Sequence, residues 1–433
     1  MSLDRRSFLK LLGASAGAAG LPMVGCATAG APMAMPKGSA RRVVVVGGGY
    51  GGTIAAKYIR MLDPSIEVVL IERNKEYVSC PFSNFYIAGL TNDMNALTIK
   101  YDKLTANHGI KVVHEDVTAI NAVDKTVTTK AGNIPYDRLI LSPGIDFRTN
   151  EIVGYDDNTA KVMPHAWKAG EQSTILRKQL QEMPDGGTVI ISMPLTPYRC
   201  PPGPYERSCL IAHYLKTHKP KSKVILLDAN PDVVSKKPLF TKAWGEMYKG
   251  TLEYINGKKV TEVNVKNKSV LIEGVEEFKG DVINLIPAQR AGNIAVAAGL
   301  VGDDGKWCPV DAVSFQSTKH ANIHVIGDAT ALPSDGPPMP KSGYSANSQA
   351  KICAQNVVAL MNGKETTELA GINVCYSAIS DHQSVSIASV YKLVGGKIKS
   401  PATAISPADF SNATMEHAFA ESWLKNILTE MST

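Results

Sequence analysis

A run of four valines that leads directly into a glycine-rich turn constrains the fold of this chain more than any other feature. Val43–Val46 has the composition of a strand that is buried on both faces, and Gly47–Gly52 follows at once. Residues 53–61 have a helical composition, and the next apolar run, 67–71, ends at Glu72. This succession predicts a strand–helix–strand unit of the dinucleotide-binding type. A glycine-rich turn on its own would not support that prediction.

The spaced glycines and the terminal acid have separate roles in such a unit. Gly47 permits the tight turn, Gly49 lets the backbone approach a pyrophosphate, and Gly52 allows the helix to pack closely on the strand. The N-terminus of the helix attracts phosphate, and Glu72 can accept hydrogen bonds from ribose hydroxyls. Strand, helix and acid are all in place, so we predict a dinucleotide site here.

Two later segments indicate that the dinucleotide is FAD. Leu139–Gly144 is a short strand that ends on small residues, and Ile323–Asp328 is another strand, which ends in Gly327 and Asp328. In flavoproteins with two dinucleotide domains, such an aspartate holds the ribityl chain of FAD. Lys341 and Tyr344 follow at the start of the next helix, where we expect them to face the flavin pyrimidine. The remaining residues that we expect around FAD are Arg73, Val117, Ser142 and Gly144.

A second region has the strands of a Rossmann unit without its phosphate-binding turn. Residues 187–192 and 224–228 are the predicted strands. Between them, segment 193–207 holds five prolines, where NADH-dependent relatives have a glycine-rich turn. Proline has no backbone N–H, so the usual phosphate cradle cannot form. We therefore expect no use of NAD(P)H, with electrons entering from a small substrate and leaving to a protein or quinone.

With these features the chain resembles the flavoprotein subunit of flavocytochrome c sulfide dehydrogenase, a relative of the sulfide:quinone oxidoreductases. The resemblance runs from about residue 40 to the C-terminus. It implies a flavoprotein that oxidises sulfide to sulfur or polysulfide and passes electrons to a c-type cytochrome subunit, which carries the haem. The motifs that carry it are Tyr77–Cys80, Arg199–Arg207, Asn284–Pro287, Trp307–Asp311 and Met339–Asn347.

The resemblance also implies roles for three residues. It implies that Cys80 bonds FAD covalently, and that Cys200 is one half of a redox-active disulfide beside the flavin. It makes Glu206 a carboxylate near the site that handles the proton of HS⁻. Arg199 and Arg207 are expected to lower the pKa of the Cys200 thiol. The alternative is that Cys200 is an inert structural cysteine.

The chain departs from the family pattern at the second active-site cysteine, which we expect directly after Gly-Asp-Ala, where this chain has Thr330. We therefore predict that Cys200 works without that disulfide, with Cys209 or Cys353 as replacement partners only if their geometry allows. The alternative function is a flavoprotein partner of a sulfur-oxidising system without sulfide dehydrogenase activity of its own. Cys308 and Cys375 lie in strand-like apolar runs. We expect both to be core thiols; the alternative is that they form a disulfide with each other.

The N-terminus has the pattern of an export signal. Arg5 and Arg6 precede an apolar, Ala/Gly-rich stretch that ends at about residue 31. This is typical of a twin-arginine signal, so we expect residues 1–31 to be removed and the protein to be periplasmic. A lipid anchor on Cys26 is the alternative. We expect no membrane span, because three glycines and a proline between residues 13 and 22 disfavour a stable helix there, and no later segment offers the ~20 apolar residues that a span needs.

Composition excludes several other classes of protein. A net charge of +6 over 433 residues is too weak and scattered to indicate nucleic acid. The nine histidines lack metal-ligand spacing and no Cys-x-x-Cys pair occurs, so we expect no metal. We predict an α/β fold with two Rossmann-like domains, the second degenerate, and a C-terminal α+β interface domain. The predicted limits are 40–153 with 285–357 for the FAD domain, 154–284 for the second domain and 358–433 for the third.

Overall fold

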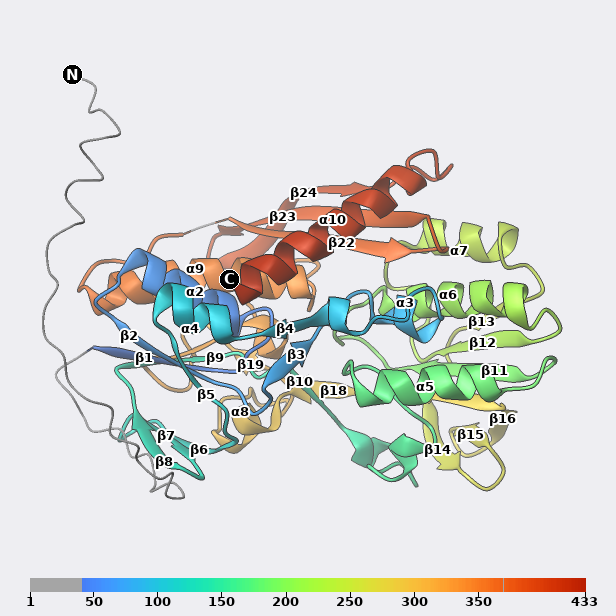
Figure 1. Ribbon diagram of the computed structural model, residues 1–433, viewed down its shortest axis with the longest axis horizontal. Helices are drawn as coiled ribbons and strands as arrows, with labels where there is room; N and C mark the ends of the chain where they lie inside the picture. Colours follow the sequence, from blue (N-terminus) through green and yellow to red (C-terminus); the bar gives the residue numbers. More distant parts are fainter. Residues whose placement is uncertain (1–40, 369) are drawn as a thin grey trace, which may run out of the picture.

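Two parallel sheets lie side by side, and a third, antiparallel sheet with a long helix lies across both (Figure 1). The computed structural model describes residues 41–433 except residue 369. The predicted export signal and Cys26 lie outside the described residues. Within that described part of the chain, no helix is both long and apolar enough to cross a membrane.

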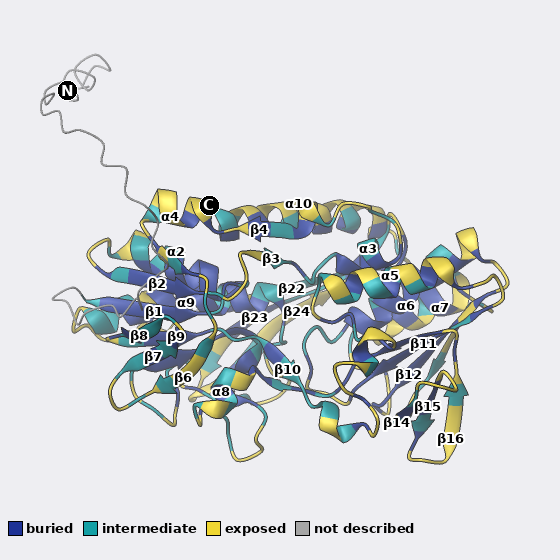
Figure 2. Cartoon of the chain, turned by 60° about the horizontal axis from the view of Figure 1, so that its bottom comes forward, coloured by how far each residue is buried: buried dark blue, intermediate teal, exposed yellow. Residues whose placement is uncertain are grey.

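The first sheet is the core of the predicted FAD domain. All its neighbouring strands pair in parallel, and the valines of its central strand are 0–6% exposed. Helices α2 (Gly52–Leu62) and α9 (Gly343–Met361) pack against each other, and the central strands are dark in Figure 2 because both faces are covered. The predicted strands 43–46 and 67–71 and the helix between them are confirmed. In order, the strands are β20 (Ile323–Val325), β9 (Arg138–Leu141), β1 (Arg42–Val46), β2 (Glu67–Ile71) and β5 (Lys111–Val113).

Smaller elements surround this sheet. Strands β3 (Glu76–Val78) and β4 (Thr98–Lys100) pair antiparallel, and the short helix α3 (Ser83–Ile87) lies in the connection between them. Helix α4 (Asp102–His108) follows β4. A three-stranded meander comprises β6 (Val117–Asn121), β7 (Thr126–Thr129) and β8 (Gly132–Pro135). Strands β10 (Ile145–Phe147) and β18 (Gln289–Ala291) form an antiparallel pair. They lie where the chain leaves the FAD domain and where it returns to it.

The second sheet is also parallel. It confirms the predicted strands at 187–192 and 224–228. Helices α5 (Glu171–Glu182), α6 (Gly203–His218) and α7 (Lys237–Glu246) belong to this unit, and its inward side chains form two clusters. An antiparallel meander follows, made of β14 (Val260–Asn264), β15 (Ser269–Ile272) and β16 (Glu276–Lys279). In order, the parallel strands are β13 (Leu252–Ile255), β12 (Lys223–Asp228), β11 (Thr188–Met193) and β17 (Val282–Leu285).

The third unit covers the junction of the other two. It consists of β22 (Gly371–Ala378), β23 (Ser384–Val394), β24 (Lys397–Ile405) and α10 (Ala413–Ser432). Helix α10 packs on β22 and β23 and reaches α2 of the first unit, whereas β22 also contacts α6 of the second. The predicted start of this unit at residue 358 falls inside α9, because the apolar residues of that helix remain packed in the first core up to its end.

Candidate functional site

The turn after β1 is shaped for a phosphate group. Gly47 has a φ of +103°, and a Cβ atom there would lie 2.1 Å from the carbonyl oxygen of Ser142. A Cβ on Gly52 would lie 1.8 Å from the carbonyl oxygen of Gly47, so both positions exclude any side chain. The N–H of Gly48 donates to the Glu72 carboxylate at 2.8 Å, which fixes this acid at the carboxyl end of β2. The backbone therefore forms the close approach that a dinucleotide needs.

Asp328 is half-buried, and one of its carboxylate oxygens is buried without a protein partner. It lies in the 3-10 turn η5 (Gly327–Ala329) after β20, and its Oδ1 has no hydrogen bond to any described residue. Burial raises its pKa, while the nearby Arg199 and Lys341 cations oppose that shift. A buried, unsatisfied carboxylate is costly in a protein, so its position suits a hydroxyl-bearing ligand. The turn after β1, Glu72 and Asp328 share the carboxyl edge of one parallel sheet, and they fit FAD.

The other predicted cofactor residues have different surroundings. Ser142 and Gly144 follow β9 beside the turn, and Gly144 has a φ of +63°. Arg73 is exposed and pairs with Asp116 at 3.3 Å. Val117 begins the β6–β8 meander and packs against the first core.

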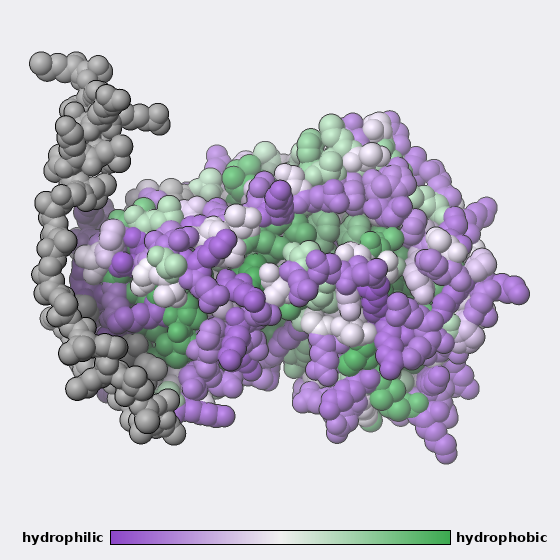
Figure 3. Space-filling model, viewed as in Figure 1, coloured by the Kyte–Doolittle hydropathy of each residue, from purple (hydrophilic) through white to green (hydrophobic). Residues whose placement is uncertain are grey.

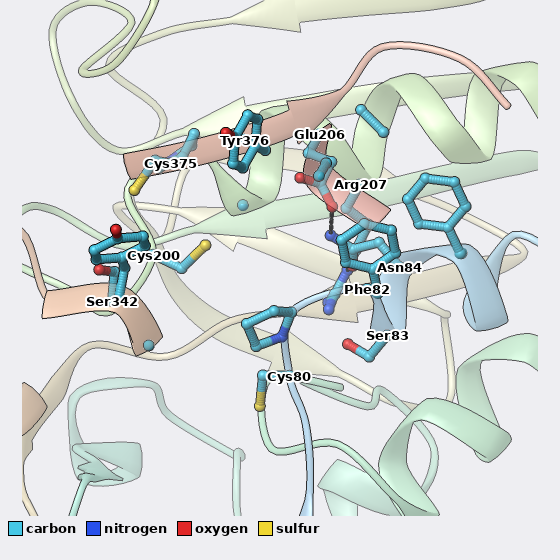
Figure 4. Close-up of a pocket in the computed structure, with 18 of the residues that line it drawn as sticks. Cys80, Phe82, Ser83, Asn84, Cys200, Glu206, Arg207, Ser342, Cys375 and Tyr376 are labelled. Atoms are coloured by element: carbon cyan, nitrogen blue, oxygen red, sulfur yellow. Dashed lines mark hydrogen bonds between the residues drawn. The ribbon is translucent and has the colours of Figure 1, made fainter. Parts of the chain in front are cut away.

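A cavity of about 100 Å³ lies where the three units meet (Figure 4). In the view of Figure 3, apolar residues show in the hollow in the middle of this face, below α10. The predicted residues Cys80, Cys200, Glu206 and Tyr344 all line this cavity. They come from different units, so only the tertiary fold brings them together. Other residues that line it are Phe82, Asn84, Arg199, Ser342, Cys375, Tyr376 and Trp423.

Cys200 is held rigidly at the head of α6. Its φ is +57°, a left-handed conformation that is uncommon for residues other than glycine. Its N–H donates to the carbonyl of Lys341 at 2.7 Å, and its own carbonyl accepts from Gly203 at 2.8 Å. Such strain persists only where surrounding contacts enforce it, and it is concentrated at functional sites. The rigid proline frame thus presents the thiol to the cavity.

Arg199 lowers the pKa of Cys200 as expected, but burial outweighs this influence, so the pKa is raised overall. Burial raises the pKa of Cys200, Glu206 adds to that rise, and Arg199 only opposes it. The Arg199 guanidinium donates instead to Cys80 Sγ at 3.2 Å. Arg207 is buried and donates to Asn84 Oδ1 at 2.8 Å and to other carbonyl groups, so it supports the walls of the cavity.

Cys375 is the functional candidate that sequence reasoning placed wrongly. It is half-buried on β22 and lines the cavity with Cys200, and Figure 4 shows the two on the same side of it. Its proximity is one of the influences that raise the pKa of Cys200. The alternation of Asn373, Cys375 and Ser377 along one strand face was the available signal, because an apolar core strand would not present that polar face.

The other cysteines do not reach the cavity. Cys209 and Cys353 are fully buried and are absent from its lining, so neither replaces a partner of Cys200. Cys308 is a buried core residue, as expected, but it does not pair with Cys375, because all six cysteines of the described chain are free thiols.

Thr330 also lies outside the cavity. Its hydroxyl donates to the carbonyl of Gly327 at 2.9 Å, and its backbone pairs with Cys308 between β19 (Cys308–Pro309) and β21 (Thr330–Ala331). A threonine at this position therefore removes no thiol from the cavity. We assumed that Cys200 has no second thiol near it. The position of Cys375 in the same cavity corrects that assumption.

Two ionisable side chains lie close to the thiols. Glu206 lines the cavity and accepts a hydrogen bond from Asn84 Nδ2 at 2.8 Å, drawn in Figure 4, and burial raises its pKa. Lys236, which sequence reasoning missed, is buried and donates to the Cys375 carbonyl at 2.7 Å and to Ser377 Oγ at 2.8 Å. Burial lowers its pKa, and the largest opposing influence is the Cys375 thiol. The cavity thus holds a carboxyl group beside two thiols, and an ammonium group lies just behind the strand that carries Cys375.

Lys341 and Tyr344 differ in their placement. Lys341 Nζ donates to the carbonyls of Asp328 at 2.9 Å and Thr330 at 2.7 Å and lies 3.7 Å from the centroid of the Trp307 ring. Burial lowers its pKa to about 8, and it does not line the cavity. It therefore secures the Asp328 turn. Tyr344 does line the cavity and stacks on Trp423 with ring centroids 6.2 Å apart.

No group of three or more metal-ligating side chains gathers anywhere in residues 41–368 and 370–433.

Comparisons with known proteins agree with this architecture. A pyridine nucleotide-disulphide oxidoreductase family model matches residues 41–178. Among solved structures, sulfide:quinone oxidoreductase from Aquifex aeolicus superposes with a TM-score of 0.75 at 20% identity, covering 91% of this chain and 92% of that one. A putidaredoxin reductase–putidaredoxin complex superposes with a TM-score of 0.64 at 18% identity, covering 90% and 98%. The chain is an FAD-dependent oxidoreductase of this fold.

More specific family models match two later parts of the chain. The central domain of the sulfide dehydrogenase [flavocytochrome c] flavoprotein chain matches residues 173–287, and the flavocytochrome c sulphide dehydrogenase flavin-binding domain matches residues 369–431. The flavoprotein chain from Chlorobaculum thiosulfatiphilum is 64% identical over 44 residues, which cover 10% of this chain and 92% of that sequence. Mitochondrial sulfide:quinone oxidoreductase from Dictyostelium discoideum is 24% identical over 328 residues, covering 73% and 70%. The chain belongs to the flavocytochrome c sulfide dehydrogenase flavoprotein family.

Proposed function

We propose that this protein is a periplasmic sulfide dehydrogenase subunit that oxidises sulfide to sulfur or polysulfide and passes the electrons to a c-type cytochrome. The observation that carries the proposal is the pair of thiols, Cys200 and Cys375, in one cavity beside the FAD-binding edge of the first sheet. The arginine pair at residues 5 and 6 supports export, and the family match supports a cytochrome partner in a heterodimer.

The two thiols act as a redox pair in this proposal. When they are joined as a disulfide, HS⁻ attacks one sulfur, the S–S bond breaks, and the attacked cysteine carries a persulfide while the other leaves as a thiolate. Sulfide thereby loses two electrons, which the disulfide takes up. Glu206 accepts the proton that HS⁻ loses, and the ammonium group of Lys236 stabilises the thiolate.

The chain's remaining groups hold the cofactor and exclude water. Gly47–Gly52, Glu72 and Asp328 would bind FAD, which supplies two-electron acceptance from thiols and one-electron release to a haem. The aromatic residues Phe82, Tyr344 and Trp423 make the cavity largely apolar, which keeps water from the persulfide.

Covalent attachment of FAD through Cys80 is part of the proposal. Cys80 is a free thiol on the cavity wall, with Arg199 Nη2 at 3.2 Å from its sulfur. The hydrogen bond from Arg199 holds this sulfur at the cavity wall. We expect flavin fluorescence to stay with the denatured polypeptide, and Cys80→Ser to release the flavin. Release of free flavin from the wild-type protein by acid precipitation would contradict the attachment.

The second sheet supports the expectation that NAD(P)H is not used. The acid at the end of β12, Asp228, is fully buried and accepts hydrogen bonds from Tyr205 at 2.7 Å, Tyr254 at 3.0 Å and the Asn230 N–H at 2.8 Å. These partners occupy the carboxylate that would otherwise bind a ribose. Flavin reduction by NADH as fast as by sulfide would overturn this expectation.

Anaerobic mixing of the purified holoprotein with sulfide tests the central claim. We expect rapid loss of flavin absorbance, and a loss of at least about 100-fold in rate for Cys200→Ser and for Cys375→Ser. Thr330→Cys is the matched control, and we expect an unchanged rate because residue 330 lies outside the cavity. An oxidised spectrum after long incubation would favour the alternative, a flavin-binding partner without this activity. An increase in rate for Thr330→Cys would reinstate the lone-thiol mechanism.

A further inference from the structure

A second cavity, of about 260 Å³, lies at the carboxyl edge of the second parallel sheet. It is lined by Ser192 at the end of β11, Ala229 just after β12 and Ile286 just after β17. Strands β12 and β17 flank β11 on opposite sides, so this is the point where the strand order reverses. Open α/β sheets bind their ligands at such points. No residue lines both this cavity and the one that contains Cys200.

The cavity carries an excess of positive charge. Arg148 is neutralised by its ion pair with Glu151. Lys259 and Lys306 also line the cavity, and within the described chain neither ammonium group has a carboxylate oxygen within 4.0 Å. Two uncompensated cations at a concave site attract an anion.

Gln289 adds an unused hydrogen-bond donor. This residue is 3% exposed, and its Oε1 accepts the Arg199 N–H at 2.8 Å. Its buried Nε2 has no partner among the described residues, although the side chain lines the cavity. Buried donors in proteins are almost always paired, so this amide indicates a missing acceptor.

The same edge lacks the groups that would recognise a nucleotide. The Asp228 carboxylate is already bonded to Tyr205, Tyr254 and Asn230, and Pro194 and Pro197 supply no N–H groups to a pyrophosphate. The volume also lies below the range of about 300–1,000 Å³ that is usual for larger ligands. A compact anion without a sugar fits these constraints.

We propose that this cavity binds a compact, sugar-free dianion of the oxyanion class, which Lys259 and Lys306 neutralise and to which Gln289 Nε2 donates. The apolar side chains of Met193 and Ile286 form part of the same wall. They favour an anion with one weakly hydrated end, such as the terminal sulfur of thiosulfate, over phosphate.

Calorimetric titration of the full-length holoprotein with thiosulfate, phosphate and AMP tests the proposal. We expect thiosulfate to bind more tightly than phosphate, and AMP more weakly than either. Lys259→Met and Lys306→Met should each weaken thiosulfate binding about tenfold. Gln289→Glu, which keeps an acceptor for the Arg199 N–H but removes the donor, should abolish binding.

Two matched variants control for general surface charge. Lys258 is the neighbour of Lys259 but pairs with Glu276 at 2.5 Å, and Lys319 pairs with Asp303 at 3.2 Å. Lys258→Met and Lys319→Met should change affinity less than twofold. The proposal is overturned by absence of binding up to about 10 mM, by equal weakening in the control variants, or by tighter binding of AMP. Phosphate binding as tightly as thiosulfate would retain the anion site and overturn the role of the apolar wall.

Discussion

A buried lysine with only neutral hydrogen-bond acceptors stands out at the level of single residues. Lys236 Nζ donates to the Cys375 carbonyl, to Ser377 Oγ and, at 3.4 Å, to the Val385 carbonyl. Its positive charge therefore favours ionised thiols in the adjoining cavity, since an opposite charge lowers a thiol pKa. We predict that Lys236→Met slows alkylation of the Cys375 thiol about tenfold at fixed pH, because the thiolate is the reactive form.

Mass-spectrometric measurement of iodoacetamide labelling at Cys375, across a range of pH, would detect that change. Lys237→Met is the matched control, because Lys237 is exposed and pairs with Asp232 at 2.5 Å. A labelling profile for Lys236→Met that coincides with the wild type would remove the lysine from the proposed mechanism.

Glu206 gives the reaction a predictable pH dependence. Burial raises its pKa, and the proposed role requires the ionised carboxylate. Sulfide oxidation should therefore be present above this raised pKa and be lost as the pH falls through it, at a higher pH than for an exposed glutamate. We predict that Glu206→Gln removes this acidic limb and lowers the rate about 100-fold or more.

The pH profile of flavin reduction by sulfide measures this effect. Glu416→Gln is a suitable control, because Glu416 is also buried but bonds to Ser406 at 2.6 Å and does not line the cavity. An acidic limb that persists unchanged in Glu206→Gln would assign the proton to another group.

At the level of elements, sequence patterns predicted the parallel sheets because their signals are local. The valine strand, the glycine turn and Glu72 are contiguous, and the prolines of residues 193–207 reveal the altered turn before α6. The cavity was harder to predict because its walls come from α3, α6, α9, β22 and α10. Whether Thr330 or Cys375 faces Cys200 depends on how the third sheet docks, and no short-range pattern encodes that contact.

Helix α6 shows how an altered connection changes the chemistry at an edge of a sheet. In a dinucleotide-binding unit the helix begins directly after the strand and its N–H groups face phosphate. Here β11 ends at Met193 and α6 begins only at Gly203, and the intervening residues carry Cys200. The N-terminus of α6 therefore faces the thiol cavity, and the vacated edge of the sheet holds the second cavity, of about 260 Å³, beside Gln289.

At the scale of the whole molecule, the third unit connects the thiol cavity with the surface. Trp423 of α10 lines the cavity and stacks on Tyr344. Phe419 and Met415 lie one and two helical turns before it, at i−4 and i−8, and are 49% and 51% exposed. This stripe, Met415–Phe419–Trp423, presents apolar side chains to solvent within one helix of the active cavity. Exposed apolar residues gathered in this way are typical of protein contact sites.

We predict that this stripe forms part of the docking site for the proposed c-type cytochrome. The variant Met415→Glu/Phe419→Glu should slow reduction of the cytochrome haem about tenfold or more, because it places charges in an apolar contact. Flavin reduction by sulfide should stay unchanged, since neither residue lines the cavity. Val123→Glu, at a residue that is 90% exposed on the first unit, is the control. Stopped-flow absorbance separates the two steps, and unchanged haem reduction in the double variant would move the docking site elsewhere. Rapid reduction of a soluble quinone in place of the haem would instead make quinone the acceptor, and the stripe would then lose its proposed partner.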